Sequence, residues 1–233
     1  MRLFIGLSLL VIFSLTAVRA DTFETQANGQ KAPVNFLPAQ GEGQHGGILI
    51  VGSGAPWDHS ELLPKLGGHF AKLGWSVALL DASQQIDKPT WVESLPEILS
   101  TLRQKNNKRT ILLYYGSQMH FLLEYFSKPQ SKQVNGLILL SAFDQFEAKD
   151  SVLLLQKLPF PVLDVVAQFD YGTILEQAAV RKKNNQSKSY RQVRFPGAVH
   201  DYYHTRRMLS YHLHSWMLNL QPTEIAGPPV VLD

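Results

Sequence analysis

The chain has 233 residues, and none of them is cysteine. This excludes a disulfide framework, a thiolate nucleophile and a zinc site built on sulfur. A domain of this length can bury enough apolar surface to fold without cross-links, and 45% of the residues are hydrophobic. The absence of cysteine therefore does not indicate in which cellular compartment the protein is located.

A strong excess of charge is missing as well. The formal net charge is +3, and it falls to +1 without the first twenty residues, which carry Arg2 and Arg19 but no acidic side chain. A nucleic-acid-binding domain would show a much larger basic excess, so we expect no nucleic-acid partner. Basic residues gather around one polar loop, and we interpret them as a solvated face. They are Arg181, Lys182, Lys183 and Lys188.

A convincing set of metal ligands is also absent. His200 and His204 have the i, i+4 spacing of two ligands on a helix, but we expect His200 to lie in a loop. No cluster of carboxylates and histidines has the spacing of a metal site. The sequence predicts neither a metal nor a cofactor.

Only one long apolar run occurs, from Leu3 to Val18. Arg2 precedes it, and Val18 and Ala20 form a small-residue cleavage pattern before Asp21. The run is rather short for a membrane-spanning helix, which needs about 20 apolar residues, although an uncleaved anchor is the alternative. We therefore predict a cleavable signal peptide at residues 1–20, a periplasmic or secreted protein, and no transmembrane anchor after cleavage.

The remaining chain predicts one domain with a short segment on either side. Residues 21–34 are polar and lack clear periodicity, which predicts a flexible lead-in. Residues 221–233 contain three prolines and are expected to lie outside the fold. Residues 35–220 then form a single domain of ordinary size.

Within this domain, apolar runs typical of strands alternate with segments of helical spacing. The predicted strands are 34–37, 47–51, 75–80, 110–115, 136–140, 161–166 and 190–195. The predicted helices are 62–73, 91–102, 119–126, 151–157, 172–182 and 202–218. Such alternation is typical of an α/β fold with a doubly wound, mostly parallel sheet. The interval between Leu140 and Pro161 has room for only a short helix, so we expect no lid domain and an open, shallow pocket.

Three segments place a glycine turn or a histidine directly after a predicted strand. The strand from Gly47 runs into a glycine turn, Gly52-Ser53-Gly54, and the strand from Ile111 runs into Gly116-Ser117-Gln118 before a helix. The last predicted strand leads through Phe195-Pro196-Gly197 to His200.

In this order the three segments resemble those of α/β-hydrolases, and the resemblance covers nearly all of residues 36–219. The Gly74-Trp75 step and the Phe-Pro-Gly…His ending are more closely similar to a bacterial family of exported α/β-hydrolase-like proteins. That family has no assigned function, and it has glycine where a working enzyme has serine.

The resemblance implies a role for each candidate residue. Ser117 would be the nucleophile, His200 the general base and Asp170 the acid that orients it. Backbone N–H groups at Gly52, Ser53, Gly54 and Gly116 would bind an oxyanion. Asp164 is a rival for the acid position, but it lies inside a predicted strand, where structural packing or pairing is the simpler interpretation.

The sequence around Ser117 departs from the requirements of a nucleophile elbow. An elbow needs positive φ at its apex and small residues two positions before and after it. These flanks are Tyr115 and Met119 if Ser117 is central, Tyr114 and Gln118 if Gly116 is central, and Gly116 and His120 if Gln118 is central. No register provides two small flanks, and glutamine is not a nucleophile. The strand length favours Gly116 at the apex, with Ser117 as a cap of the following helix.

Two functions from different classes follow. The first is a degenerate hydrolase (a pseudoenzyme) or binding protein of the cell envelope, whose ligand or protein partner the sequence does not identify. The second is a serine esterase or amidase that uses Ser117, His200 and Asp170.

Overall fold

The computed structural model describes residues 21–27, 30–41, 43–53, 61–82, 90–105, 109–128, 134–145 and 150–222. The predicted signal peptide, residues 223–233 of the tail, and Gly54 all lie outside the described residues. Our predictions for them therefore stay predictions.

The centre of the protein is an eight-stranded sheet of order β1-β2-β4-β3-β5-β6-β7-β8. All pairs from β4 to β8 are parallel, and β1 and β2 are antiparallel to their neighbours. The strands are β1 (Asp21–Ala27), β2 (Gln30–Leu37), β3 (Gly46–Ser53), β4 (Trp75–Ala82), β5 (Thr110–Gly116), β6 (Gly136–Leu140), β7 (Val162–Phe169) and β8 (Tyr190–Val199). The predicted mostly parallel, doubly wound sheet is confirmed.

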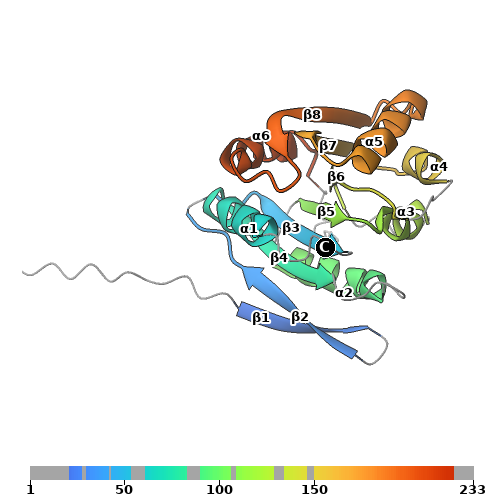
Figure 1. Cartoon of the computed structure of the whole chain (residues 1–233). Helices are drawn as coiled ribbons and strands as arrows, with labels where there is room; N and C mark the ends of the chain where they lie inside the picture. The colour runs from blue at the N-terminus through green and yellow to red at the C-terminus, as the bar shows by residue number, and fades with distance from the viewer. Residues whose placement is uncertain are drawn as a thin grey trace, which may run out of the picture.

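Helices cover both faces of this sheet (Figure 1). The helices are α1 (Leu62–Lys72), α2 (Trp91–Gln104), α3 (Met119–Ser127), α4 (Ser151–Gln156), α5 (Gly172–Asn184) and α6 (Arg206–Leu218). One face packs against α1 and α6, and the other against α2 to α5. Between β6 and β7 the described residues contain α4 as the only helix, in agreement with the predicted absence of a lid.

Side-chain alternation along β5 determines on which face of the sheet each residue near the candidate site lies. Ile111, Leu113 and Tyr115 point to the α1/α6 face, whereas Leu112 and Tyr114 point to the α2/α3 face. Successive side chains of a strand point to opposite faces of the sheet. The two tyrosines at the end of β5 therefore lie on opposite sides of the turn that follows.

The predicted lead-in is wrong, because residues 21–37 contain two paired strands. β1 and β2 pair antiparallel from Asp21↔Phe36 to Ala27↔Gln30, and β2 joins the sheet through Asn35–Leu37 against β4. Buried Val34 and Phe36 alternate with exposed Asn35, as in a half-buried strand. The sequence contained the signal: Asn28-Gly29, a dipeptide typical of two-residue hairpin turns, stands between the strands.

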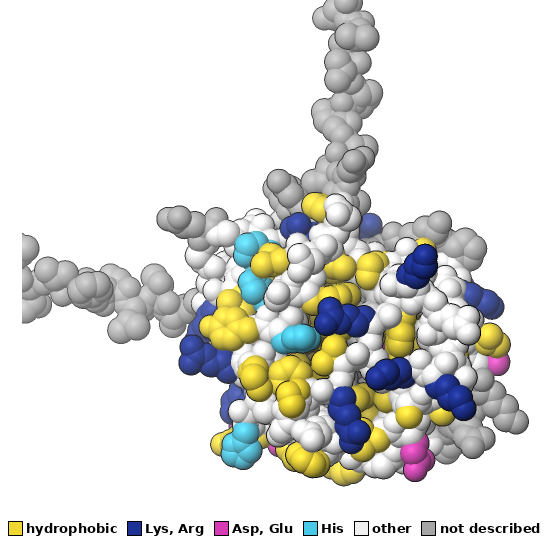
Figure 2. Space-filling view, turned by 90° about the horizontal axis from the view of Figure 1, so that it is seen from above, with side chains coloured by type: hydrophobic (Ala, Val, Ile, Leu, Met, Phe, Trp, Pro, Cys, Tyr) yellow, Lys and Arg dark blue, Asp and Glu magenta, His cyan; other side chains and the backbone are white. Residues whose placement is uncertain are grey.

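β8 forms one edge of the sheet and carries features that discourage further strand pairing. Arg191 and Arg194 are exposed on it, and Pro196 lacks an N–H group. Figure 2 looks onto this side of the molecule, where many Lys and Arg side chains but few Asp and Glu are visible. Within the described residues, no helix combines the length and apolar character needed to span a bilayer.

Candidate functional site

The carboxyl ends of β7 and β8 bring Asp170 and His200 together. Asp170 follows β7 directly, and His200 follows β8. His200 Nδ1 lies 2.7 Å from Asp170 Oδ1, so the imidazole and the carboxylate are hydrogen-bonded. The chain order thus predicted a real contact between residues 30 positions apart.

Four hydrogen bonds fix the Asp170 carboxylate. Oδ1 accepts from His200 and from the Tyr171 N–H, and Oδ2 accepts from the Ser141 hydroxyl and the Ala167 N–H. Burial alone would raise the pKa of Asp170, but the hydrogen bonds from His200 and Ser141 and the nearby His200 charge together hold it below its usual value. Asp170 is therefore ionised at neutral pH and accepts a hydrogen bond from Nδ1–H of His200.

Two tyrosine rings flank the His200 imidazole. Tyr115 and Tyr171 have ring centroids 5.1 and 4.7 Å from it, and His200 is only 8% exposed. A cavity of about 350 Å³ opens beside the pair, lined by Phe169, Asp170, Tyr171, Val199, His200 and Asp201. The histidine is thus sheltered at the wall of a pocket.

The elbow turn has its apex at Gly116. Gly116 has φ +139°, whereas Ser117 is not among the described residues with positive φ. A Cβ atom on Gly116 would lie 1.8 Å from the carbonyl oxygen of Ser53. This confirms the predicted register and shows why the position holds glycine: β3 and β5 approach too closely there for any side chain.

The N–H groups that an elbow offers to an oxyanion already have partners. The Ser117 N–H donates to the Ser53 carbonyl at 3.1 Å, and the Gln118 N–H donates to the Tyr114 hydroxyl at 2.8 Å. Burial raises the pKa of the Tyr114 phenol far above its usual range, so Tyr114 keeps its proton and also bonds the Ser53 hydroxyl. Of the other predicted oxyanion residues, Gly52 and Ser53 end β3, and a Cβ on Gly52 would meet Leu63 at 2.6 Å.

Ser117 itself is 1% exposed, and its Oγ has no hydrogen-bond partner among the described residues. The predicted cap is therefore wrong. The N-cap of α3 is Gln118, and the first N–H groups of the helix donate to the Phe143 carbonyl and to Asp144 Oδ1. The segment after β6 thus accepts the hydrogen bonds from the start of α3 that we expected Ser117 to accept.

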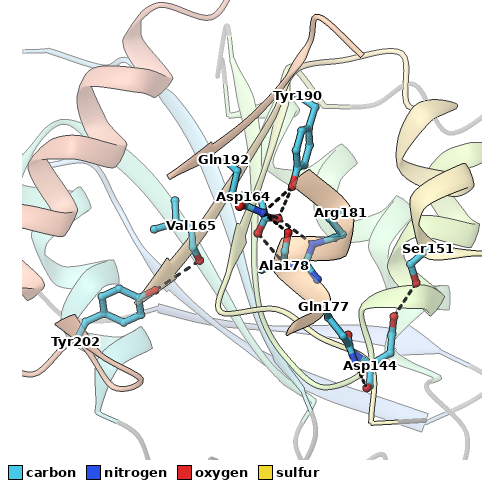
Figure 3. A network of polar contacts seen from close by, with 10 residues as sticks. All are labelled: Asp144, Ser151, Asp164, Val165, Gln177, Ala178, Arg181, Tyr190, Gln192 and Tyr202. Carbon is cyan, nitrogen blue, oxygen red and sulfur yellow. Dashed lines mark hydrogen bonds and ion pairs between the residues drawn. The ribbon is translucent and has the colours of Figure 1, made fainter. Parts of the chain in front are cut away.

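The structure contains a second His–Asp pair, His120 and Asp144, which sequence reasoning missed. His120 Nδ1 lies 2.8 Å from Asp144 Oδ1, and the Ser151 hydroxyl donates to Asp144 Oδ2 at 2.7 Å. Gln177 of α5 bonds the Asp144 backbone through both its amide atoms (Figure 3). The partners come from three separate segments, and no local motif marks them.

Asp164 has the structural role that we expected. It lies in β7 and forms a two-point ion pair with Arg181, at 2.8 and 3.1 Å, and it also accepts from Tyr190 and Gln192 (Figure 3). Arg181 is only 2% exposed, so its assignment to a solvated face is wrong, although Lys182, Lys183 and Lys188 are exposed. The arginine is buried because Asp164, in the adjacent strand, needs a countercharge.

Comparison with known proteins supports the fold. No family model and no curated protein matches the sequence. Among solved structures, Est1E from Butyrivibrio proteoclasticus superposes with a TM-score of 0.64 at 16% identity, over 84% of this chain and 97% of that one. The esterase domain of a Rhodothermus marinus protein gives 0.68 at 11%, over 87% and 99%. An α/β serine hydrolase homologue from Coxiella burnetii gives 0.62 at 18%, over 87% and 98%.

These likenesses, together with the sheet order and the His–Asp pair at the carboxyl ends of the strands, define the class. The protein has the α/β-hydrolase fold.

The lowered pKa of Asp170 predicts an acid-sensitive contribution to stability. A carboxylate with a depressed folded-state pKa stabilises the fold above its unfolded pKa of about 3.9, and this contribution is lost as the pH falls through the folded value. The difference in unfolding free energy between the wild type and Asp170→Asn should therefore be largest from pH 5 to 7 and shrink below pH 4. Urea unfolding at several pH values measures it. A difference that stays constant down to pH 3 would contradict the assignment.

Proposed function

We propose that this protein is a hydrolase-fold protein without a working serine nucleophile, and that it binds a ligand in the pocket beside His200 and Asp170. The observation that carries the proposal is that the N–H groups of the elbow already have hydrogen-bond partners within the protein. In either register, the N–H that the elbow would offer to an oxyanion is bonded within the protein. The Ser117 N–H, which follows Gly116, donates to the Ser53 carbonyl, and the Gln118 N–H, which follows Ser117, donates to the Tyr114 hydroxyl. An acyl-transfer site needs such donors free and aimed at the developing charge.

The pocket supplies the binding surface. Phe169, Tyr171 and Val199 are 63%, 50% and 44% exposed at its rim, and Phe169 pairs with Val199 across β7 and β8. Large apolar side chains that gather around a cavity are typical of a ligand site. The proposed ligand is a small organic molecule with an apolar group that these side chains contact. We also propose, from the signal peptide that the sequence predicts at residues 1–20, that this takes place in the periplasm or outside the cell.

The second candidate is a serine esterase or amidase that uses Ser117, His200 and Asp170. The observation that favours it is the His200–Asp170 hydrogen bond of 2.7 Å, which a working triad requires. Similar folds include a protein described as a dienelactone hydrolase from Anabaena variabilis. Activity would require the elbow to rearrange, so that Ser117 becomes accessible and Gln118 N–H leaves the Tyr114 hydroxyl.

Labelling with a fluorophosphonate probe separates the two functions. We expect no labelling of the folded mature protein. We also expect the wild type to hydrolyse esters at a rate within about twofold of the rates of the Ser117→Ala and His200→Ala variants. In a working enzyme, by contrast, loss of the triad serine costs about 10⁶-fold in kcat. An active serine hydrolase added to the same tube controls for the probe, and circular dichroism controls for folding. Labelling that disappears in both variants would overturn the proposal and establish the esterase.

A further inference from the structure

Two strained residues meet behind the His200–Asp170 pair. In the part of the chain that the structure describes, Ser141 and Tyr202 are the non-glycine residues with positive φ, at 43° and 52°. Ser141 follows β6, and Tyr202 lies two residues after His200. Their hydroxyl oxygens are 2.9 Å apart, although the residues are 61 positions apart in the sequence.

Such backbone conformations are retained only where the surroundings enforce them. Serine and tyrosine pay a conformational cost at positive φ that glycine does not. Both side chains are fully buried, so solvent exposure cannot explain their positions. Glycine at position 141 would remove the strain and with it the hydroxyl group. The function of that hydroxyl is therefore the point to explain.

The hydrogen bonds run in one direction. Ser141 has a single hydroxyl proton, and it donates this proton to Asp170 Oδ2, which as a carboxylate can only accept. Tyr202 must then be the donor between the two hydroxyls, since burial raises its pKa well above 10 and it keeps its proton. A weaker contact of 3.5 Å links the Tyr202 hydroxyl to the Val165 carbonyl (Figure 3).

This series of hydrogen bonds determines the orientation of the His200 imidazole. With Oδ2 held by Ser141 and the Ala167 N–H, the carboxylate plane is fixed and Oδ1 points to His200 Nδ1. A carboxylate on Nδ1 selects the tautomer with the proton on that nitrogen. We infer that Ser141 and Tyr202 are positioning residues, which hold Asp170 and through it His200 in one orientation and one tautomer.

The second His–Asp pair provides a matched control. Ser151 donates to Asp144 Oδ2 as Ser141 donates to Asp170 Oδ2, and a histidine Nδ1 occupies Oδ1 in both pairs. Ser151 begins α4 and is not among the residues with positive φ. Removing its hydroxyl therefore deletes the same kind of bond without touching His200.

The experiment records the Nδ1–H proton of His200 by nitrogen-15 NMR in protein labelled at histidine, with His200→Gln to assign the signal. In Ser141→Ala we expect this proton to exchange with water about tenfold faster, the factor that corresponds to one lost hydrogen bond. Tyr202→Phe should give a smaller acceleration of about threefold, because the Ser141 bond remains. Ser151→Ala should leave the signal unchanged.

Ser141→Gly separates the hydroxyl from the strain and keeps the test decisive if Ser141→Ala folds poorly. It should be the more thermally stable of the two and should show the same acceleration, about tenfold, in the exchange of the His200 Nδ1–H proton. An unchanged signal in Ser141→Gly, or an equal effect of Ser151→Ala, would overturn the inference. The test needs neither ligand nor catalysis, so it can fail while the proposed binding function stands, and the reverse also holds.

Discussion

The Gly116→Ser variant will lose about 3 to 4 kcal/mol of unfolding free energy and will gain no esterase activity. Serine at this position is what the elbow of a working hydrolase requires, so the substitution looks like a repair. Here the new Cβ would lie 1.8 Å from the Ser53 carbonyl oxygen, and the end of β3 would have to move. That movement would also break the bond from the Ser117 N–H to the same oxygen.

Gly197→Ser is the control for backbone conformation alone. Gly197 also has positive φ, at +68°, but no atom lies within 4 Å of the Cβ position. It should cost only about 1 kcal/mol, the usual cost of the left-handed region. Urea unfolding of both variants gives the two values, and the fluorophosphonate probe gives the activity. A Gly116→Ser protein as stable as Gly197→Ser, or one labelled in a His200-dependent way, would show that the turn can accept a nucleophile.

The elbow illustrates what the sequence could predict. The apex at Gly116 followed from strand length, because a continuous apolar run predicts where a buried strand must turn. The partners of the turn could not be predicted in this way. Phe143 and Asp144 reach the start of α3 from the loop after β6, and their contacts depend on the tertiary arrangement rather than on any local pattern.

The Asp170–His200 pair was predictable for a different reason. Parallel strands end at the same edge of a sheet, so polar residues that follow β7 and β8 must lie close together. The start of α6 was harder to predict, because we expected the helix to begin at residue 202 and it begins at Arg206. Tyr202 has positive φ and belongs to the turn, where its hydroxyl reaches Ser141. A tyrosine in helical spacing gives no sign of such a role.

Arg181 shows how a weak amphipathic pattern misleads. In α5, only Ile174, Ala178 and Arg181 are buried, so the buried stripe contains a charged residue that composition assigns to solvent. Its partner Asp164 lies 17 residues away, in a strand whose other residues from Val162 to Ala167 are apolar. A charged residue in such a strand is the signal that could have predicted a buried counterion.

Breaking this ion pair is the second large effect that we expect. Arg181→Met should lower the unfolding free energy by about 3 to 5 kcal/mol, because it leaves the Asp164 carboxylate buried without its countercharge. Tyr190 and Gln192 still donate to that carboxylate, but neither carries a positive charge. Denaturant unfolding of the variant at pH 7 measures the loss.

The double variant Asp164→Leu with Arg181→Met should recover most of that loss, to within about 2 kcal/mol of the wild type, because apolar residues of similar volume can replace a buried ion pair. In both variants the His200 Nδ1–H signal should stay at its wild-type position. Asp164 and Asp170 lie on or directly after the same strand, yet each is bonded to its own set of partners. If the His200 signal moved with Arg181→Met, the ion pair would belong to the site, and its burial would be explained by function rather than by packing of α5 on the sheet.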